Sequence, residues 1–102
     1  MQKKISDILP KTEILAQLAE EASELAQAAL KLRRALDGTN PTPKSIEECR
    51  KAFEEECADV MVCMVALGAS GDGKAHERIE IISSEKYYRW LHRLQDKEQP
   101  DE

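Results

Sequence analysis

The sequence lacks a long apolar run. A membrane-spanning helix needs about 20 consecutive apolar residues, and no stretch of the 102-residue chain approaches that length. The N-terminal segment "MQKKISDILP" contains lysines but no extended apolar core, so it does not have the pattern of a secretory signal. We therefore expect a cytoplasmic protein that does not associate with a membrane.

Residues that bind transition metals are also few. The cysteines, Cys49, Cys57 and Cys63, are odd in number and show no C-x-x-C spacing, so the sequence does not predict a zinc site. Neither His76 nor His92 has the Glu-x-x-His spacing of di-iron bundles, which disfavours iron. We expect the cysteines to be reduced thiols.

Aromatic residues make up only 4% of the chain, and positive charge is in deficit, with a formal net charge of −5. A protein that binds a nucleic-acid polymer needs a net basic surface, so this class is disfavoured. Binding of a single nucleotide stays open, because metal ions can lie between acidic residues and phosphate groups.

What is present is a strong helical pattern. Apolar residues recur every three or four positions, which predicts three helices over residues 12–36, 45–67 and 75–95. The turn-rich segments "DGTNPTP" and "GASGDG" separate these helices. Ser45 and Glu48 fit a capping box at the start of the second helix. No segment alternates as a strand does, so the predicted class is all-α.

The chain is long enough for one small domain. We predict a helical bundle with three main helices, a core over residues 12–95 and a flexible tail over residues 96–102. The apolar residues of each helix form a stripe along it, and the stripes of the three helices would be buried best by a second copy of the chain, which would complete a four-helix core. The stripes contain Ile14, Leu18, Ala22, Leu25, Ala29, Leu32 and Leu36; then Ile46, Cys49, Phe53, Val60, Met64 and Leu67; then Ile79, Tyr87, Trp90, Leu91 and Leu94.

Carboxylates lie beside the apolar faces of the first two helices. Successive helix residues turn by about 100°, which places Glu21 about 60° and Glu24 about 120° from the centre of the first stripe, on the same side. In the second helix Glu56 lies about 40° and Asp59 about 100° from the centre of the stripe. Glu20 points away from its stripe. Each helix thus carries one acid-x-x-acid pair that runs from the shoulder of the buried face to its flank.

A short connection makes these helices antiparallel neighbours, so their acidic flanks can face each other. Clustered carboxylates raise each other's pKa unless a positive charge compensates them, and a buried unpaired charge is costly. No lysine or arginine lies between the paired acids of either helix. Oxygen donors suit Mg²⁺, with Mn²⁺ as a substitute. The alternative is that these acids are surface groups that pair with lysines of a neighbouring element.

At these residues the sequence resembles the MazG-like all-α nucleoside triphosphate pyrophosphohydrolases. The family signature is E-E-x-x-E followed by E-x-x-D on the next helix. Here it reads Glu20-Glu21-Ala22-Ser23-Glu24, then Glu56-Cys57-Ala58-Asp59. The resemblance covers about residues 12–95. It implies that Glu21, Glu24, Glu56 and Asp59 are metal ligands and that Glu20 either supports these ligands from outside or positions a water molecule.

The resemblance also implies an activity and an assembly. Family members hydrolyse nucleoside triphosphates to monophosphates and pyrophosphate with Mg²⁺, and they form dimers or tetramers. The basic edge of the third helix, Lys86, Arg89 and Arg93 with Trp90, would contact the nucleotide; otherwise it is a solvated face with Trp90 in the core. Two alternatives stay open: hydrolysis of phosphoribosyl-ATP, and a non-catalytic helical adaptor whose acids bind a basic partner or a structural metal.

Overall fold

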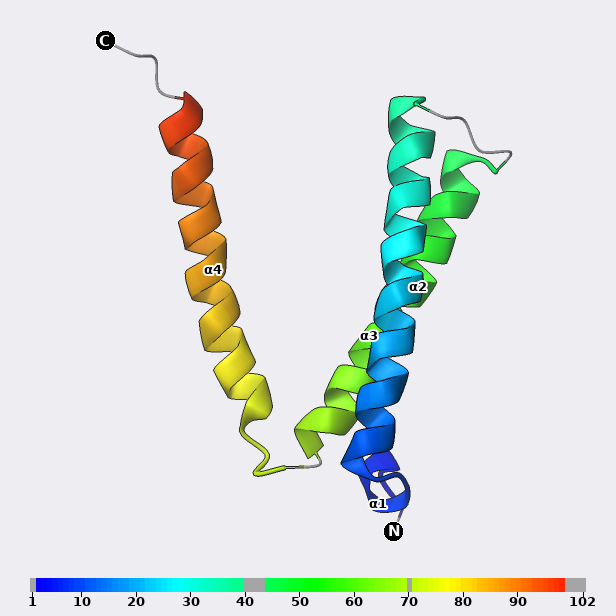
Figure 1. Cartoon of the computed structure of the whole chain (residues 1–102), viewed down its shortest axis with the longest axis vertical. Helices are drawn as coiled ribbons and strands as arrows, with labels where there is room; N and C mark the ends of the chain where they lie inside the picture. The colour runs from blue at the N-terminus through cyan, green and yellow to red at the C-terminus, as the bar shows by residue number, and fades with distance from the viewer. Residues whose placement is uncertain (1, 40–43, 70, 99–102) are drawn as a thin grey trace.

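The computed structural model of the chain describes residues 2–39, 44–69 and 71–98, and these residues form helices and connections without a strand. The helices are α1 (Ile5–Ile8), α2 (Lys11–Asp37), α3 (Ile46–Ala69) and α4 (Ala75–Glu98). The all-α class is confirmed (Figure 1). One short helix, α1, was not expected from the sequence, because its single turn is too short to show a periodic pattern.

The ends of the long helices follow local sequence signals. α2 starts after Pro10 and stops at Gly38, whose φ of 72° lies in the left-handed region and whose N–H donates to the carbonyl of Arg34. At α3 the predicted capping box is confirmed: the Glu48 N–H donates to Ser45 Oγ at 3.1 Å, and the Ser45 N–H donates to Glu48 Oε1 at 3.3 Å. The predicted stop signals Pro41 and Pro43 lie outside the described residues.

Removal of this cap is expected to destabilise the fold measurably. Ser45→Ala deletes the oxygen that accepts from the Glu48 N–H, and the loss of an N-cap costs about 1 kcal/mol. Urea denaturation followed by circular dichroism measures the change in unfolding free energy. Ser84→Ala, at an exposed position within α4, is the control and should change it by less than about 0.5 kcal/mol. Equal effects of the two substitutions would contradict the role of the cap.

The core lies between α2 and α3, which form an antiparallel hairpin (Figure 1). Its buried side chains in the described part of the chain are few and mostly small: Ile14, Cys49, Cys63 and Ala66. Large apolar side chains remain exposed on α3, with Met61 at 66% and Val65 at 73%. The hairpin therefore buries one seam and leaves further apolar surface uncovered.

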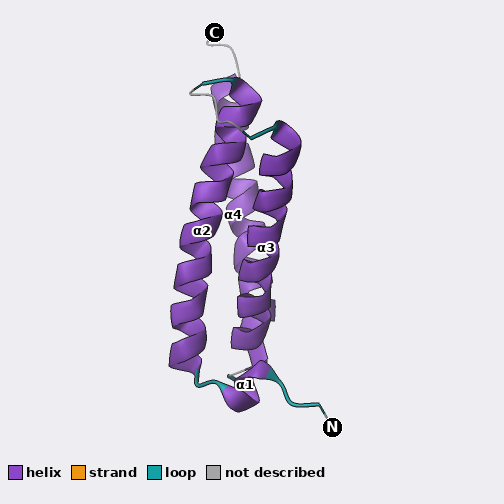
Figure 2. Ribbon diagram, turned by 90° about the vertical axis from the view of Figure 1, so that its right-hand side faces the viewer, coloured by secondary structure: helices purple, strands orange, loops and turns teal. Residues whose placement is uncertain are grey.

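α4 leaves the hairpin after its first turn. It runs antiparallel to α3, and the space between them widens toward the C-terminal end, so that the chain has the outline of a V (Figure 1). Turned by 90°, the view looks onto α2 and α3 side by side with α4 behind them (Figure 2). At the closed end of the V, Ala75 and Ile79 of α4 share an apolar hollow with Met64 and Leu67 of α3.

The position of α4 corrects two expectations. Residues 96–98 are helical and not part of a flexible tail, because α4 extends to Glu98; residues 99–102 lie outside the described part. The stripe of α4 is not buried in the single chain: Trp90 is 60% exposed and Tyr87 62%. The helix forms as predicted, but beyond its first turns the single chain leaves its large apolar side chains exposed.

The membrane prediction can be compared with the structure. No helix in the described ranges is both long and apolar enough to cross a bilayer.

Candidate metal site

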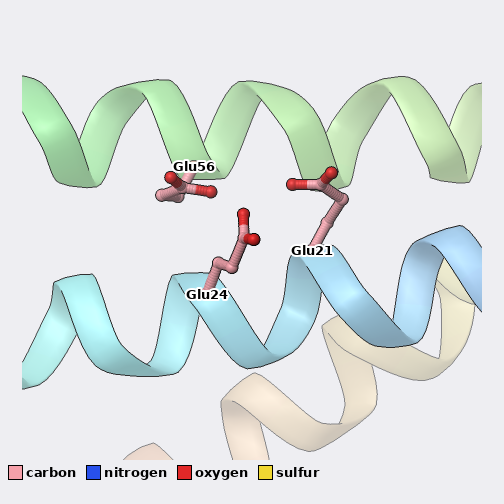
Figure 3. Close-up of side chains that lie close together, drawn as sticks. All are labelled: Glu21, Glu24 and Glu56. Atoms are coloured by element: carbon pink, nitrogen blue, oxygen red, sulfur yellow. The ribbon is translucent and has the colours of Figure 1, made fainter.

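Three glutamates meet between α2 and α3. Glu21 and Glu24 project from α2 toward α3, and Glu56 projects from α3 into the same space (Figure 3). One carboxylate oxygen from each residue lies within 4.8 Å of one from each of the others. The spacing of three residues on α2 sets two carboxylates on one side of the helix, and the antiparallel hairpin brings the third opposite them.

Two of these carboxylates have an oxygen that is shielded from solvent and has no hydrogen-bond partner. They are Oε2 of Glu21 and Oε2 of Glu56. The other oxygen of Glu21 accepts a hydrogen bond from Gln17 Nε2 at 2.7 Å, which fixes the side chain in its orientation. A buried acceptor without a partner is costly, and natural structures retain few of them. The arrangement of these two oxygens therefore suits a positively charged ligand.

The third carboxylate, Glu24, has a pKa that is shifted by its charged neighbours. The pKa of Glu24 is raised above its ordinary value, first by repulsion from Glu21, then by repulsion from Glu56 and by burial. A like-charged cluster favours the neutral form of one member, whereas a bound cation would favour the charged form of all three. The cluster therefore favours protonation of Glu24, and a bound cation would oppose it.

The raised pKa of Glu24 predicts that the stability of the metal-free protein depends on pH. Because the pKa of Glu24 is raised from 4.5 on folding, its contribution is fully present below pH 4.5 and is lost as the pH rises through the folded pKa. We expect Glu24→Gln to raise the melting temperature at pH 7 in chelator and to lose this advantage below pH 4.5. Glu55→Gln, at an exposed position on α3, is the control. Parallel pH profiles for wild type and Glu24→Gln would contradict the account.

The donor set fits a hard divalent cation. All three side chains present oxygen only, which suits Mg²⁺ or Mn²⁺ and not zinc. Mg²⁺ keeps several of its waters and binds through one or two carboxylates together with substrate phosphates. The opening between the three oxygens is compatible with that mode of binding.

The two remaining acids of the sequence signature lie at the edge of this cluster. Glu20 is exposed, and its charge contributes to the raised pKa of Glu24. Asp59 is exposed on α3, one turn beyond Glu56, and is not among the three residues whose oxygens converge. Its charge and that of Glu21 both act on Cys63. The structure thus brings together three of the four predicted ligands.

The neighbouring glutamate Glu54 behaves as an ordinary surface charge. It pairs with Arg50 at 3.2 Å, and both side chains are largely exposed. Glu56, two residues further, points between the helices instead. The same helix therefore separates solvated from converging acids by their position around the axis.

A small hollow opens beside the glutamates, and it is lined in part by residues that the sequence did not indicate as site residues. It has a volume of about 180 Å³, and Glu24 and Glu56 form one part of its lining. Lys31 and Lys44 line it as well. Lys31 lies seven residues after Glu24, which is two turns along the same helix face. That spacing was the available signal; Lys44 precedes α3 and has no periodic signal.

The predicted basic edge of α4 forms a surface of its own on that helix. Lys86, Arg89, Trp90 and Arg93 line one shallow hollow on α4, all with exposed side chains. None of them lines the hollow beside Glu24 and Glu56. In the single chain these four residues and the acidic cluster are two separate surfaces.

The thiol of Cys63 is affected by the charge of Glu21, a member of the cluster, and by the charge of Asp59. It is buried, and its pKa is raised by that burial and by the charges of Glu21 and Asp59. A raised pKa keeps the thiol protonated at neutral pH, and the thiolate is the reactive form of cysteine. Cys63 therefore serves as a packing residue and not as a nucleophile.

Comparisons with protein-family models, with curated proteins and with solved structures gave no match for this chain. The converging carboxylates, their unpartnered oxygens and the adjoining hollow are therefore the features from which a function can be inferred.

Proposed function

We propose that the protein is a Mg²⁺-dependent nucleoside triphosphate pyrophosphohydrolase that acts on ribo- or deoxynucleotides, including non-standard ones. The observation that carries the proposal is the pair of solvent-shielded, unpartnered oxygens of Glu21 and Glu56 beside Glu24. An ordinary surface cluster would leave such oxygens in water or pair them with a basic side chain. The E-E-x-x-E and E-x-x-D signatures support the same reading.

In this proposal Glu21, Glu24 and Glu56 hold the cation, and Asp59 can join them through a water molecule. Bound Mg²⁺ supplies charge neutralisation for the triphosphate and lowers the pKa of a coordinated water. Glu20, at the solvent edge, orients the attacking water and accepts its proton. Lys31 and Lys44 line the adjoining hollow, where a phosphate group can contact them.

The reaction is a single displacement at the α-phosphorus. The water oxygen forms a bond to this phosphorus, and the bond to the oxygen that bridges the α- and β-phosphorus breaks. The products are a nucleoside monophosphate and pyrophosphate, which leaves with the bridging oxygen. Positioning and electrostatics provide most of the catalysis of such phosphoryl chemistry, so no covalent nucleophile is needed.

Pyrophosphate release from a panel of ribo- and deoxynucleoside triphosphates, with Mg²⁺ and with excess chelator, tests the proposal. We expect release from at least one nucleotide, and none in chelator. Stabilisation by Mg²⁺ without release from any nucleotide would instead indicate a structural metal site in a helical adaptor. Pyrophosphate release from phosphoribosyl-ATP alone would indicate that the substrate is phosphoribosyl-ATP and not a free nucleoside triphosphate.

We also propose that the active form is a homodimer or homotetramer. The exposed stripe of α4 and the uncovered apolar residues of α3 support this assembly. No described helix spans a membrane, so these apolar surfaces are not explained as membrane-spanning segments.

A further inference from the structure

The single chain exposes far more surface than a compact protein of its mass. Its accessible surface is 8564 Å², against about 5,800 Å² expected for a folded monomer of 11.5 kDa, an excess of about 2,800 Å². Its radius of gyration is 18.1 Å, whereas about 13 Å is typical of a domain of this length. Obligate dimers bury about 2,000–5,000 Å² or more in total, which is about 1,000–2,500 Å² on each chain. A second copy of the chain can therefore account for most of the excess.

The distribution of apolar side chains on α4 favours a second copy over closure of α4 onto its own hairpin. Trp90 and Leu94 lie on one side of the helix, while Ile81 and Tyr88 lie more than about 100° away around the axis. All four are exposed. A helix that is apolar on more than one side needs neighbours on more than one side, and a single hairpin covers only one of them.

The candidate site is also incomplete in one chain. The hollow beside Glu24 and Glu56 has a volume of about 180 Å³, whereas pockets for small-molecule ligands usually measure about 300–1,000 Å³. It is large enough for phosphate groups but not for a whole nucleotide. The surface that contacts the rest of the substrate has to come from another element.

The charges of α4 complement the acidic cluster. The segment 86–93 contains Lys86, Arg89 and Arg93 and no acidic residue. Measured from the connection between α3 and α4, Lys86 lies about 17 Å along α4 and Glu56 about 20 Å back along α3, at 1.5 Å per residue. The basic segment is therefore level with the cluster but on the other arm of the V (Figure 1).

We infer that a second copy of the chain packs into the V and that its α4 places Lys86, Arg89 and Arg93 at the acidic cluster of the first copy. The exchange is reciprocal, so a dimer contains two sites, each with the acids of one chain and the basic segment of the other. The substrate phosphates lie between them. This inference rests on the proposed function for the identity of the ligand but not for the interface itself.

Subunit mixing tests the shared site. Glu56→Gln disables the acids of one chain, and the double variant Arg89→Gln/Arg93→Gln disables the basic segment of the other. Each variant alone is expected to lose about 10²-fold or more in kcat/KM. After the two are unfolded and refolded together, statistical mixing should restore about a quarter of the wild-type activity, because half of the dimers contain one intact site.

A second readout detects the interface without activity. Wild-type protein labelled with ¹⁵N is mixed with unlabelled protein and treated with a carbodiimide, which joins a lysine to a contacting carboxylate. We expect peptides that join Lys86 of one isotope to Glu20, Glu24 or Asp59 of the other. Sedimentation at increasing concentration should show a dimer.

The outcomes separate the two claims. An active wild type with no recovery on mixing would overturn the shared site and leave the pyrophosphohydrolase in place. An inactive wild type with mixed-isotope crosslinks would remove the activity and retain the interface. A protein that is still monomeric at about 100 µM, where an interface with a dissociation constant of about 1 µM would be largely occupied, would overturn the inference. Crosslinks of a single isotope only would overturn it as well.

Discussion

Glu56→Gln is expected to lower kcat/KM for the best nucleoside triphosphate by about 10²–10³-fold. Glutamine keeps the size of the side chain but removes the charge of a carboxylate that has one solvent-shielded, unpartnered oxygen. Its amide also presents an N–H₂ group where a cation would require a second oxygen. Initial rates of pyrophosphate release over a range of Mg²⁺ concentrations measure the effect.

The control for this substitution is Glu55→Gln on the same helix. Glu55 is exposed and one residue away, so the change in net charge is the same and the position around the axis differs. We expect its kcat/KM to remain within about twofold of wild type, because surface substitutions away from a site have small effects. Circular dichroism confirms that both variants are folded. Equal kinetics for Glu56→Gln and wild type would remove this carboxylate from the mechanism.

Trp90→Glu is expected to convert the assembly to monomers. In the single chain Trp90 is 60% exposed, so a charged replacement has little to disrupt within one subunit. Buried in an interface, a tryptophan contributes about 2 kcal/mol or more to binding, and its replacement would raise the dissociation constant by at least about 30-fold. Sedimentation velocity over a concentration series measures this constant.

Glu13→Gln is the control for the interface. Glu13 is exposed in the first turn of α2, so the substitution changes charge outside the exposed apolar sides of α4. We expect the dissociation constant to remain close to that of wild type. If Trp90→Glu sediments as wild type does, α4 does not use this side for assembly, and its apolar stripe needs another explanation.

Much of the acidic cluster could be predicted from helical periodicity. Glu56 lies within the apolar stripe of its helix, and Glu21 lies at the edge of the stripe of its helix. These positions predicted that both side chains would turn inward, and each has an oxygen that is shielded from solvent. The same angles placed Asp59 further out, and it is exposed. Periodicity fixes the direction of a side chain around one helix, and the antiparallel hairpin brings the facing sides together.

The position of α4 could not be predicted in the same way. Its stripe indicated a helix with a buried face, which assumes that the partner surface belongs to the same chain. The structure separates α4 from the hairpin beyond its first turn, and Trp90 has no packing surface there. Periodicity says that a face needs cover but not which molecule provides it. The hollow with Lys44 was missed for a related reason, since a residue in a connection has no helical phase.

Direct binding of Mn²⁺ tests the proposed metal site itself, because it requires neither a substrate nor an assembly. The electron paramagnetic resonance signal of free Mn²⁺ gives the bound fraction during a titration of wild type, Glu56→Gln and Glu55→Gln at neutral pH. We expect saturable binding by wild type and Glu55→Gln, competition by Mg²⁺, and at least about tenfold weaker binding by Glu56→Gln. Weak, non-saturating binding that is the same in all three proteins would contradict the proposed metal site.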